Sequence, residues 1–423
     1  MKGLLKNREY LILMMAQGIS SIGDWLSMVA IITLVGLKWN ASPMEVSFII
    51  LCLALPMALL GPVAGTLADR VNRKSLMMIS DLVRAGLILV LTIANTIGVV
   101  YICLFTIGVF SAVFVPAKNG KLKELVAEED LKAAMSVTSM IDSSTKIIGP
   151  LLSGIFVTAF GAQTVFYLDS LTFLASALLI MALPKTLSGS KDSTQLSPAN
   201  NYSFKKDFIL GISYMKSNKY LLVGLFFLGV SLLILQLSDS QIIVLLRELT
   251  HSSPDLFGYI VAASGIGMFL SGMFLTKKTN YPSYPLMLLG VCGIGFSFGI
   301  MAVFTNFDYH GSIIWAPLLG LLAGFSASFV FIPFQATLQL DTPVHMTGRV
   351  FGVVNSVTTT ATIIGPLLGG WLATEFGIIP TFILTASLLL VLSVIGFFVK
   401  SKVERGKVDV SKGQPGTLET TKG

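Results

Sequence analysis

Residues 331–372 read FIPFQATLQLDTPVHMTGRVFGVVNSVTTTATIIGPLLGGWL, and residues 114–156 read FVPAKNGKLKELVAEEDLKAAMSVTSMIDSSTKIIGPLLSGIF. A Phe-x-Pro triplet opens each stretch, and the run Ile-Ile-Gly-Pro-Leu-Leu-x-Gly lies near the end of each. The two copies are separated by about half of the 423 residues, a far longer period than that of a solenoid or a propeller. We therefore interpret the chain as two related halves, an organisation typical of secondary transporters.

The composition indicates a membrane protein. Of the residues, 54% are hydrophobic and 12% are charged, whereas ordinary soluble domains carry roughly 25% charged residues. A membrane-spanning helix needs roughly 20 apolar residues. The apolar runs predict an all-α polytopic protein with twelve transmembrane helices in two pseudo-symmetric six-helix halves. The predicted spans are residues 9–37, 45–68, 74–96, 98–117, 136–159, 163–183, 218–246, 255–276, 284–305, 311–335, 349–374 and 378–400.

Four segments follow from this reading of the chain. Residues 1–183 form the N-terminal half and residues 218–400 the C-terminal half. Between them, residues 184–217 form a cytoplasmic linker, whose second part is expected to be a helix at the membrane interface. Residues 401–423 are polar and are expected to be a disordered cytoplasmic tail. The apolar face of the interfacial helix would consist of Phe204, Phe208, Ile212 and Met215.

The basic residues predict the orientation. If both termini are cytoplasmic, nearly all of the 29 Lys and Arg residues fall in cytoplasmic loops, and only Lys38 and Arg247 fall outside. This distribution obeys the positive-inside rule and places the chain in the cell membrane. The net charge of +7 therefore reflects topology, and no nucleic-acid partner is expected.

Charged residues inside spans are costly and mark candidate functional sites. Asp24 in span 1 is a candidate for the coupling proton or for a cationic substrate, or alternatively a helix-packing contact. Asp169 in span 6 and Asp239 in span 7 are further candidates, each with a structural alternative. Asp81 and Arg84, three residues apart in span 3, are interpreted as a structural ion pair.

Asp142 and Lys146 lie four residues apart in span 5 and so share a helix face. The second copy of this segment has Thr358 and Thr362 at the equivalent positions. The fold therefore does not require the two charges, which favours a role in coupling or substrate binding. The alternative is a neutralised pair that only sets helix packing.

The loop after span 2 carries a recognisable motif, Gly65-Thr-Leu-Ala-Asp69-Arg70-Val-Asn72-Arg73-Lys74. It resembles the cytoplasmic loop motif of the major facilitator superfamily, G-x-L-A-D-R-x-G-R-K. Asn72 replaces the second glycine, and because Asn tolerates left-handed geometry we expect the turn to be kept. The resemblance implies a cytoplasmic gate, in which Asp69 caps a helix of the opposite half when that side is closed. The gate motif comprises Gly65, Asp69, Arg70, Arg73 and Lys74.

A second motif in span 5 resembles the G-P-x-x-G-G motif of drug exporters in the same superfamily. Span 4 lacks the arginine that many proton-coupled exporters carry. The combined pattern, with Gly23-Asp24-Trp25 and Tyr167-Leu-Asp169, looks closest to the macrolide-efflux and enterobactin-exporter branch. Small residues and proline in spans 5 and 11 indicate either a moving helix interface or close packing alone. This helix-interface motif comprises Gly149, Pro150, Gly154, Gly365, Pro366, Gly369 and Gly370.

We therefore expect a secondary active transporter that exports an amphipathic or lipophilic small molecule by proton antiport and alternating access. No Walker A motif is present, and no cofactor, metal site or enzymatic activity is expected. The expected partners are the substrate, protons and the bilayer, with the monomer as the working unit. Alternatives are export of a self-made siderophore or peptide antibiotic, lysophospholipid flipping, or a permease-like sensor that does not transport.

Overall fold

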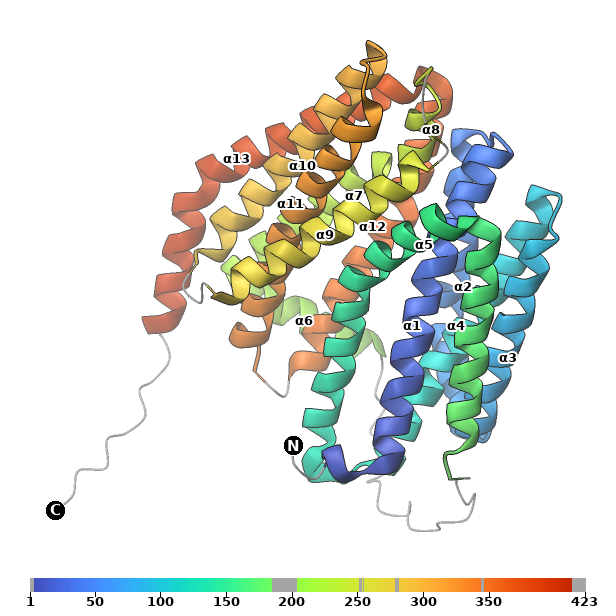
Figure 1. Ribbon diagram of the computed structural model, residues 1–423. Coiled ribbons are helices and arrows are strands. Elements are labelled where there is room, and N and C mark those ends of the chain that lie inside the picture. Colours follow the sequence, from blue (N-terminus) through green and yellow to red (C-terminus); the bar gives the residue numbers. More distant parts are fainter. Residues whose placement is uncertain are drawn as a thin grey trace.

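The computed structural model describes residues 4–184, 204–250, 253, 255–277, 281–343 and 346–412, and these residues are almost entirely helical (Figure 1). The first half contains α1 (Arg8–Thr33), α2 (Pro43–Arg70), α3 (Arg73–Thr92), α4 (Ile97–Leu125) and α5 (Leu131–Met181). The rest contains α6 (Phe204–Ser217), α7 (Lys219–Asp239), α8 (Ile242–Leu246), α9 (Leu256–Lys277), α10 (Ser283–Asn306), α11 (Ser312–Asp341), α12 (Thr347–Phe376) and α13 (Ile378–Lys412). Short helical turns are η1 (Leu4–Lys6), the π-helical η2 (Leu34–Lys38) and η3 (Glu128–Asp130).

The described helices account for twelve membrane crossings. Eleven segments among them are long and apolar enough to span a membrane. One of these, Ala133–Met181, has 49 residues, about 74 Å of helix, which is more than twice the roughly 30 Å hydrocarbon core. Gly161, with φ 77° and ψ 160°, interrupts its helical geometry, so α5 contains two crossings joined by a bend. The predicted all-α fold with twelve membrane helices is confirmed.

Local sequence explains where several helices begin. Ser42 and Glu45 form a capping box at the start of α2, and Pro43 occupies the first turn, where its missing N–H costs nothing. Asn72 caps α3, and its side chain accepts a hydrogen bond from the backbone N–H of Ser75 at 3.2 Å. Its φ of −58° shows that the expectation of a left-handed turn at this position is wrong. Asn72 instead acts as a helix cap, a position that Asn favours.

Two helix boundaries differ from the sequence pattern. The apolar run 218–246 is divided into α7 and α8 by a turn at Ser240 and Gln241. Helix α13 continues to Lys412, into the tail expected to be disordered, and residues 413–423 lie outside the described part.

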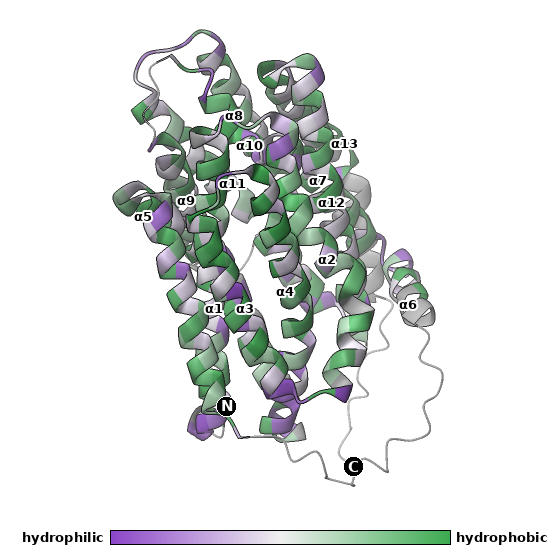
Figure 2. Cartoon of the chain, turned by 90° about the vertical axis from the view of Figure 1, so that its right-hand side faces the viewer, coloured by the Kyte–Doolittle hydropathy of each residue, from purple (hydrophilic) through white to green (hydrophobic). Residues whose placement is uncertain are grey.

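Hydrophobic residues run along most of the length of the helices (Figure 2). Large hydrophobic side chains are exposed on helices of both halves, such as Ile102 on α4 at 69% and Phe398 on α13 at 82%. Such a surface would be an aggregation hazard in water, but it suits contact with lipid chains.

The two halves contact each other near one end of the bundle. The bend at Gly161, the turn between η2 and α2, and α8 lie at this end, which we call the bend end; η1 and the last turns of α13 lie at the opposite, terminal end (Figure 1). Gly154 of α5 lies against Gly258 and Ala262 of α9, and Gly36 lies against Ile243 of α8. The ribbons of α5 and α9 converge toward the bend end and diverge toward the terminal end (Figure 1).

Candidate functional site

The packing of α1 against α5 brings two predicted site residues together. Asp169, in the second crossing of α5, is fully buried and accepts hydrogen bonds from the hydroxyls of Ser27 and of Thr172, the latter at 3.1 Å. Asp24 lies one turn before Ser27 on α1. Gly23 makes this approach feasible, because a Cβ at this position would collide with Asp169 and Thr172.

Helix α3 adds a third carboxylate and an arginine to this site. The Arg84 guanidinium forms an ion pair with Asp81 on its own helix, and its Nη1 lies 3.7 Å from Asp24 Oδ1. The Ser176 hydroxyl donates to Asp81 at 2.6 Å. We call Asp24, Asp81, Arg84 and Asp169 the carboxylate cluster.

The members of the carboxylate cluster differ in their exposure. Asp81 and Asp169 are 0% exposed and Arg84 is 2% exposed, whereas the Asp24 side chain is 50% exposed. Asp24 is therefore the member that solvent or a ligand can reach. The sequence indicated Asp24 and Asp169 as site candidates and Asp81 with Arg84 as an ion pair, which the structure contains. The proximity of Arg84 to Asp24 was not predicted, because the i,i+3 spacing indicated a self-contained pair.

The predicted pair in the first crossing of α5 lies outside this cluster. Asp142 accepts a hydrogen bond from the Gln17 amide of α1 at 2.6 Å and interacts electrostatically with Lys118 of α4. Lys146 is exposed. In the second half, the hydroxyls of the matching threonines bond to carbonyls of their own helix.

Asp239 lies at the end of α7 and is exposed. Its neighbour Gln241 is fully buried, and the Gln241 amide donates to the Ser47 hydroxyl at 2.9 Å and to the Pro43 carbonyl at 3.1 Å. The Ser47 hydroxyl in turn donates to the Pro366 carbonyl at 2.5 Å. This polar contact joins α2 to the second half at the bend end. The sequence shows Gln241 in a polar patch with Gln236, Ser238 and Asp239, but it does not show the contact with α2, because the partners lie about 200 residues apart in the chain.

The gate motif lies at the terminal end. Gly65, Asp69 and Arg70 belong to the last turns of α2, and Arg70 is exposed; the side chain of Asp69 is outside the described part of the structure. Arg73 forms an ion pair with Glu124 at 2.7 Å and donates to the carbonyls of Ala68 and Gly120. Lys74 donates to the carbonyls of Met181 and Leu183 at 2.7 and 2.5 Å. In this conformation the two basic residues therefore bind within their own half.

The glycines of the helix-interface motif stand at close helix contacts. Gly149 lies against Trp25 of α1, Gly365 against Gln236 of α7, and Gly369 against the backbone of Leu237. Gly370 lies against Ser47 of α2. Pro150 lies within α5 and Pro366 within α12. Together with Gly154, these positions line contacts of α5 with α1 and α9, and of α12 with α2 and α7.

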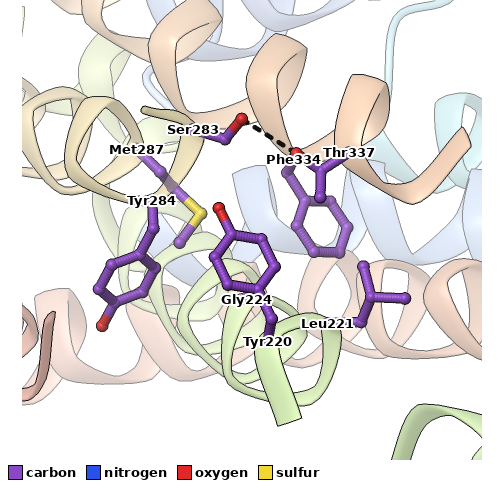
Figure 3. Close-up of a pocket in the computed structure, with 8 residues that line it drawn as sticks. All are labelled: Tyr220, Leu221, Gly224, Ser283, Tyr284, Met287, Phe334 and Thr337. Carbon is purple, nitrogen blue, oxygen red and sulfur yellow. Dashed lines mark hydrogen bonds between the residues drawn. The ribbon is translucent and has the colours of Figure 1, made fainter. Parts of the chain in front are cut away.

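A small cavity lies inside the second half, between α7, α10 and α11 (Figure 3). Its volume is about 10 Å³, room for about one water molecule, so it does not accommodate a drug-sized ligand. Within the described residues, no group of three or more His, Cys, Asp or Glu is placed to hold a metal ion. The residues that line the cavity are Tyr220, Leu221, Gly224, Ser283, Tyr284, Met287, Phe334 and Thr337.

Comparison with known proteins identifies the family. The family model for the Major Facilitator Superfamily matches residues 13–361. The chain belongs to the major facilitator superfamily. A nucleoside transporter of this fold, NupG, superposes with a TM-score of 0.67 at 12% identity, covering 92% of this chain and 98% of NupG.

Two relatives of this major facilitator span nearly its whole length. YfiS of Bacillus subtilis, described as an uncharacterized MFS-type transporter, is 36% identical over 98% of this chain and 99% of its own. Macrolide efflux protein A of Streptococcus pyogenes is 24% identical over 90% of this chain and 93% of its own. The resemblance to the drug-efflux branch of the superfamily is thereby confirmed.

Proposed function

We propose that this major facilitator exports amphipathic or lipophilic small molecules, macrolide-like drugs among them, in exchange for protons. It would lie in the cell membrane with both termini in the cytoplasm, so that the terminal end faces the cytoplasm. The similarity to macrolide efflux protein A supports the direction and the substrate class.

The carboxylate cluster is the observation that carries this proposal. Three carboxylates and one guanidinium would bear a net charge of −2 if all were ionised, which is costly within a membrane span. Protonation of two of the carboxyl groups would make the cluster neutral. A site that is neutral only when it holds protons is suited to take them from one side and release them to the other.

Asp24 is the group that we expect to exchange its proton, because it alone in the cluster is half exposed. With the halves closed at the bend end, Asp24 would release its proton to the cytoplasm and the substrate would bind. Rocking of the halves to the opposite arrangement would then release substrate and reload Asp24. Each charge that crosses 100 mV supplies about 2.3 kcal/mol.

The test is substrate-induced proton movement in everted membrane vesicles. Macrolides, catecholate siderophores, lysophospholipids and cationic dyes are added in turn to vesicles with the wild type, with Asp24→Asn, or with the control Glu375→Gln, which changes an exposed carboxylate at the end of α12. A macrolide or dye should dissipate the pH gradient with the wild type and the control, and not with Asp24→Asn. A response restricted to siderophores or lysophospholipids would overturn the substrate class, and equal responses with Asp24→Asn would overturn the coupling site.

A further inference from the structure

We infer that Arg84, held in place by Asp81, is a positioning residue that sets how readily Asp24 gives up its proton. This inference rests on the proposed proton exchange at Asp24. It assigns the α3 pair a part in coupling, in place of the purely structural role that its spacing indicates.

The Arg84 guanidinium is fixed on several sides. Arg84 Cζ lies 4.4 Å from the centroid of the Phe173 ring and 4.7 Å from the centroid of the Phe114 ring. Such cation–π contacts hold a guanidinium in one orientation. Asp81 is in turn anchored by Ser176. Arg84 therefore has little freedom to follow a moving partner.

The contact of Arg84 with Asp24 is looser than its contact with Asp81. The 3.7 Å separation between Arg84 Nη1 and Asp24 Oδ1 exceeds hydrogen-bond distance, so the attraction is Coulombic. Arg84 Nη2 bonds to Asp81, whereas Nη1 is the nitrogen that faces Asp24. Nη1 can therefore donate to the Asp24 carboxylate once Asp24 has lost its proton.

The charges around Arg84 come from three helices. Asp24 on α1, Asp81 on α3 and Asp169 on α5 interact with it electrostatically, and α4 contributes the uncharged ring of Phe114. When Asp24 and Asp169 are both protonated, Asp81 alone balances Arg84. When the proton leaves Asp24 for water, the new carboxylate faces a guanidinium already in position.

The second half of the protein shows that the fold does not need these charges. Helix α10 occupies the place of α3 in that half, and its sequence SYPLMLLGVCGIGFSFGIMAVFTN contains no Asp, Glu, Lys or Arg. Burying an ion pair rarely adds stability compared with apolar residues. The charges in α3 are therefore better explained by coupling than by packing.

The experiment follows the pH dependence of the proton release that a macrolide induces from purified protein in detergent. Removal of the guanidinium in Arg84→Gln should move the half-maximal pH upward by about one unit or more, because Asp24 loses a positive neighbour. Removal of the competing carboxylate in Asp81→Asn should move it downward. Arg84→Lys keeps the charge but not the stacked guanidinium and should give a midpoint between those of the wild type and Arg84→Gln.

The opposite directions distinguish positioning from packing, since a packing defect would lower the amplitude without moving the midpoint. Midpoints that stay at the wild-type value, or that move in the same direction, would overturn the inference. If a single variant does not fold, the charge-balanced double variant Asp81→Asn/Arg84→Gln should fold and give a midpoint between the two single-variant predictions. A double-variant midpoint outside that interval would also overturn the inference. Absence of proton release by the wild type would instead refute the proposed function.

Discussion

At the scale of single residues, Gly23 decides whether the carboxylate cluster can form. A side chain at this position would occupy the space of the Asp169 carboxyl and the Thr172 hydroxyl. Small residues let membrane helices approach closely. Here the close approach brings the functional groups of α1 and α5 into one site.

We predict that Gly23→Val both destabilises the protein and abolishes coupling. The added side chain would push Asp169 from its position, at a cost of about 1–3 kcal/mol for overpacking. A lower Tm and loss of substrate-induced proton movement would be observed. The control is Gly86→Ala on α3, where an added Cβ meets nothing within 4 Å; a Gly23→Val protein with normal Tm and coupling would refute this role.

The residue scale also shows what sequence can reveal. Asp24 and Asp169 were predictable because a carboxylate in an apolar run is conspicuous. Their proximity was not, since they lie far apart in the chain and meet only through helix packing. The ion pair of Asp81 and Arg84 expected from the sequence is present, but a spacing of three residues could not reveal that Arg84 also lies near Asp24 on another helix.

At the scale of elements, α6 is attached to the second half. Gly211 lies against the backbone of Arg349, and the Tyr214 hydroxyl donates to the Asp341 carbonyl at 2.6 Å. Met215 is 1% exposed. Part of the predicted apolar face of α6 therefore packs against the second half instead of facing the membrane. The side chains of Phe204 and Phe208 lie outside the described part of the structure.

We predict that Tyr214→Phe loosens α6 without stopping transport. Losing one hydrogen bond costs about 1 kcal/mol, so amide hydrogen exchange in α6 should be roughly fivefold faster. Ser217→Ala is the control, because the Ser217 hydroxyl donates to the Tyr214 carbonyl within α6 itself. Unchanged exchange in Tyr214→Phe would show that apolar packing alone holds α6.

The same contact has a defined pH dependence. Burial, and secondarily the charge of Asp341, raises the pKa of Tyr214 above its usual value near 10. The Tyr214 hydroxyl can donate its hydrogen bond only while the phenol is neutral. The stabilisation of α6 by this bond is therefore fully present below pH 10 and is lost as the pH rises through the raised pKa. An absorbance titration should therefore show one tyrosine fewer ionising near pH 10 in the wild type than in a variant whose α6 is detached by Gly211→Val.

At the scale of the whole molecule, the two halves are joined at the bend end by a few polar contacts. Gln241 bonds to Ser47 and Pro43 of α2, Ser47 bonds to Pro366 of α12, and Arg247 donates to the Gly36 carbonyl at 3.2 Å. Alternating access requires these bonds to break. The duplication predicted two halves, but the conformation they adopt depends on these tertiary contacts, which no repeat pattern encodes.

We predict that Gln241→Leu shifts the protein toward separation of the halves at the bend end. Leucine fills similar space but cannot donate, and the loss of two hydrogen bonds of about 1 kcal/mol each should raise the population of the separated state roughly thirtyfold. The distance between the halves can be measured with spin labels at Ile93→Cys and Phe307→Cys, since these two residues are 73% and 74% exposed. The labels are placed in a protein from which Cys52, Cys103 and Cys292 have been removed.

In that measurement, the Gln241→Leu distance distribution should gain a longer component that the unsubstituted background lacks or holds only weakly. The control is Ser231→Ala, whose hydroxyl bonds within α7 to Leu228 and which should leave the distribution unchanged. If Gln241→Leu and the control gave the same distribution, the polar contacts would not hold the bend end closed. Closure would then depend on the glycine contacts between α5 and α9, and Gly154→Val would be the variant that separates the halves.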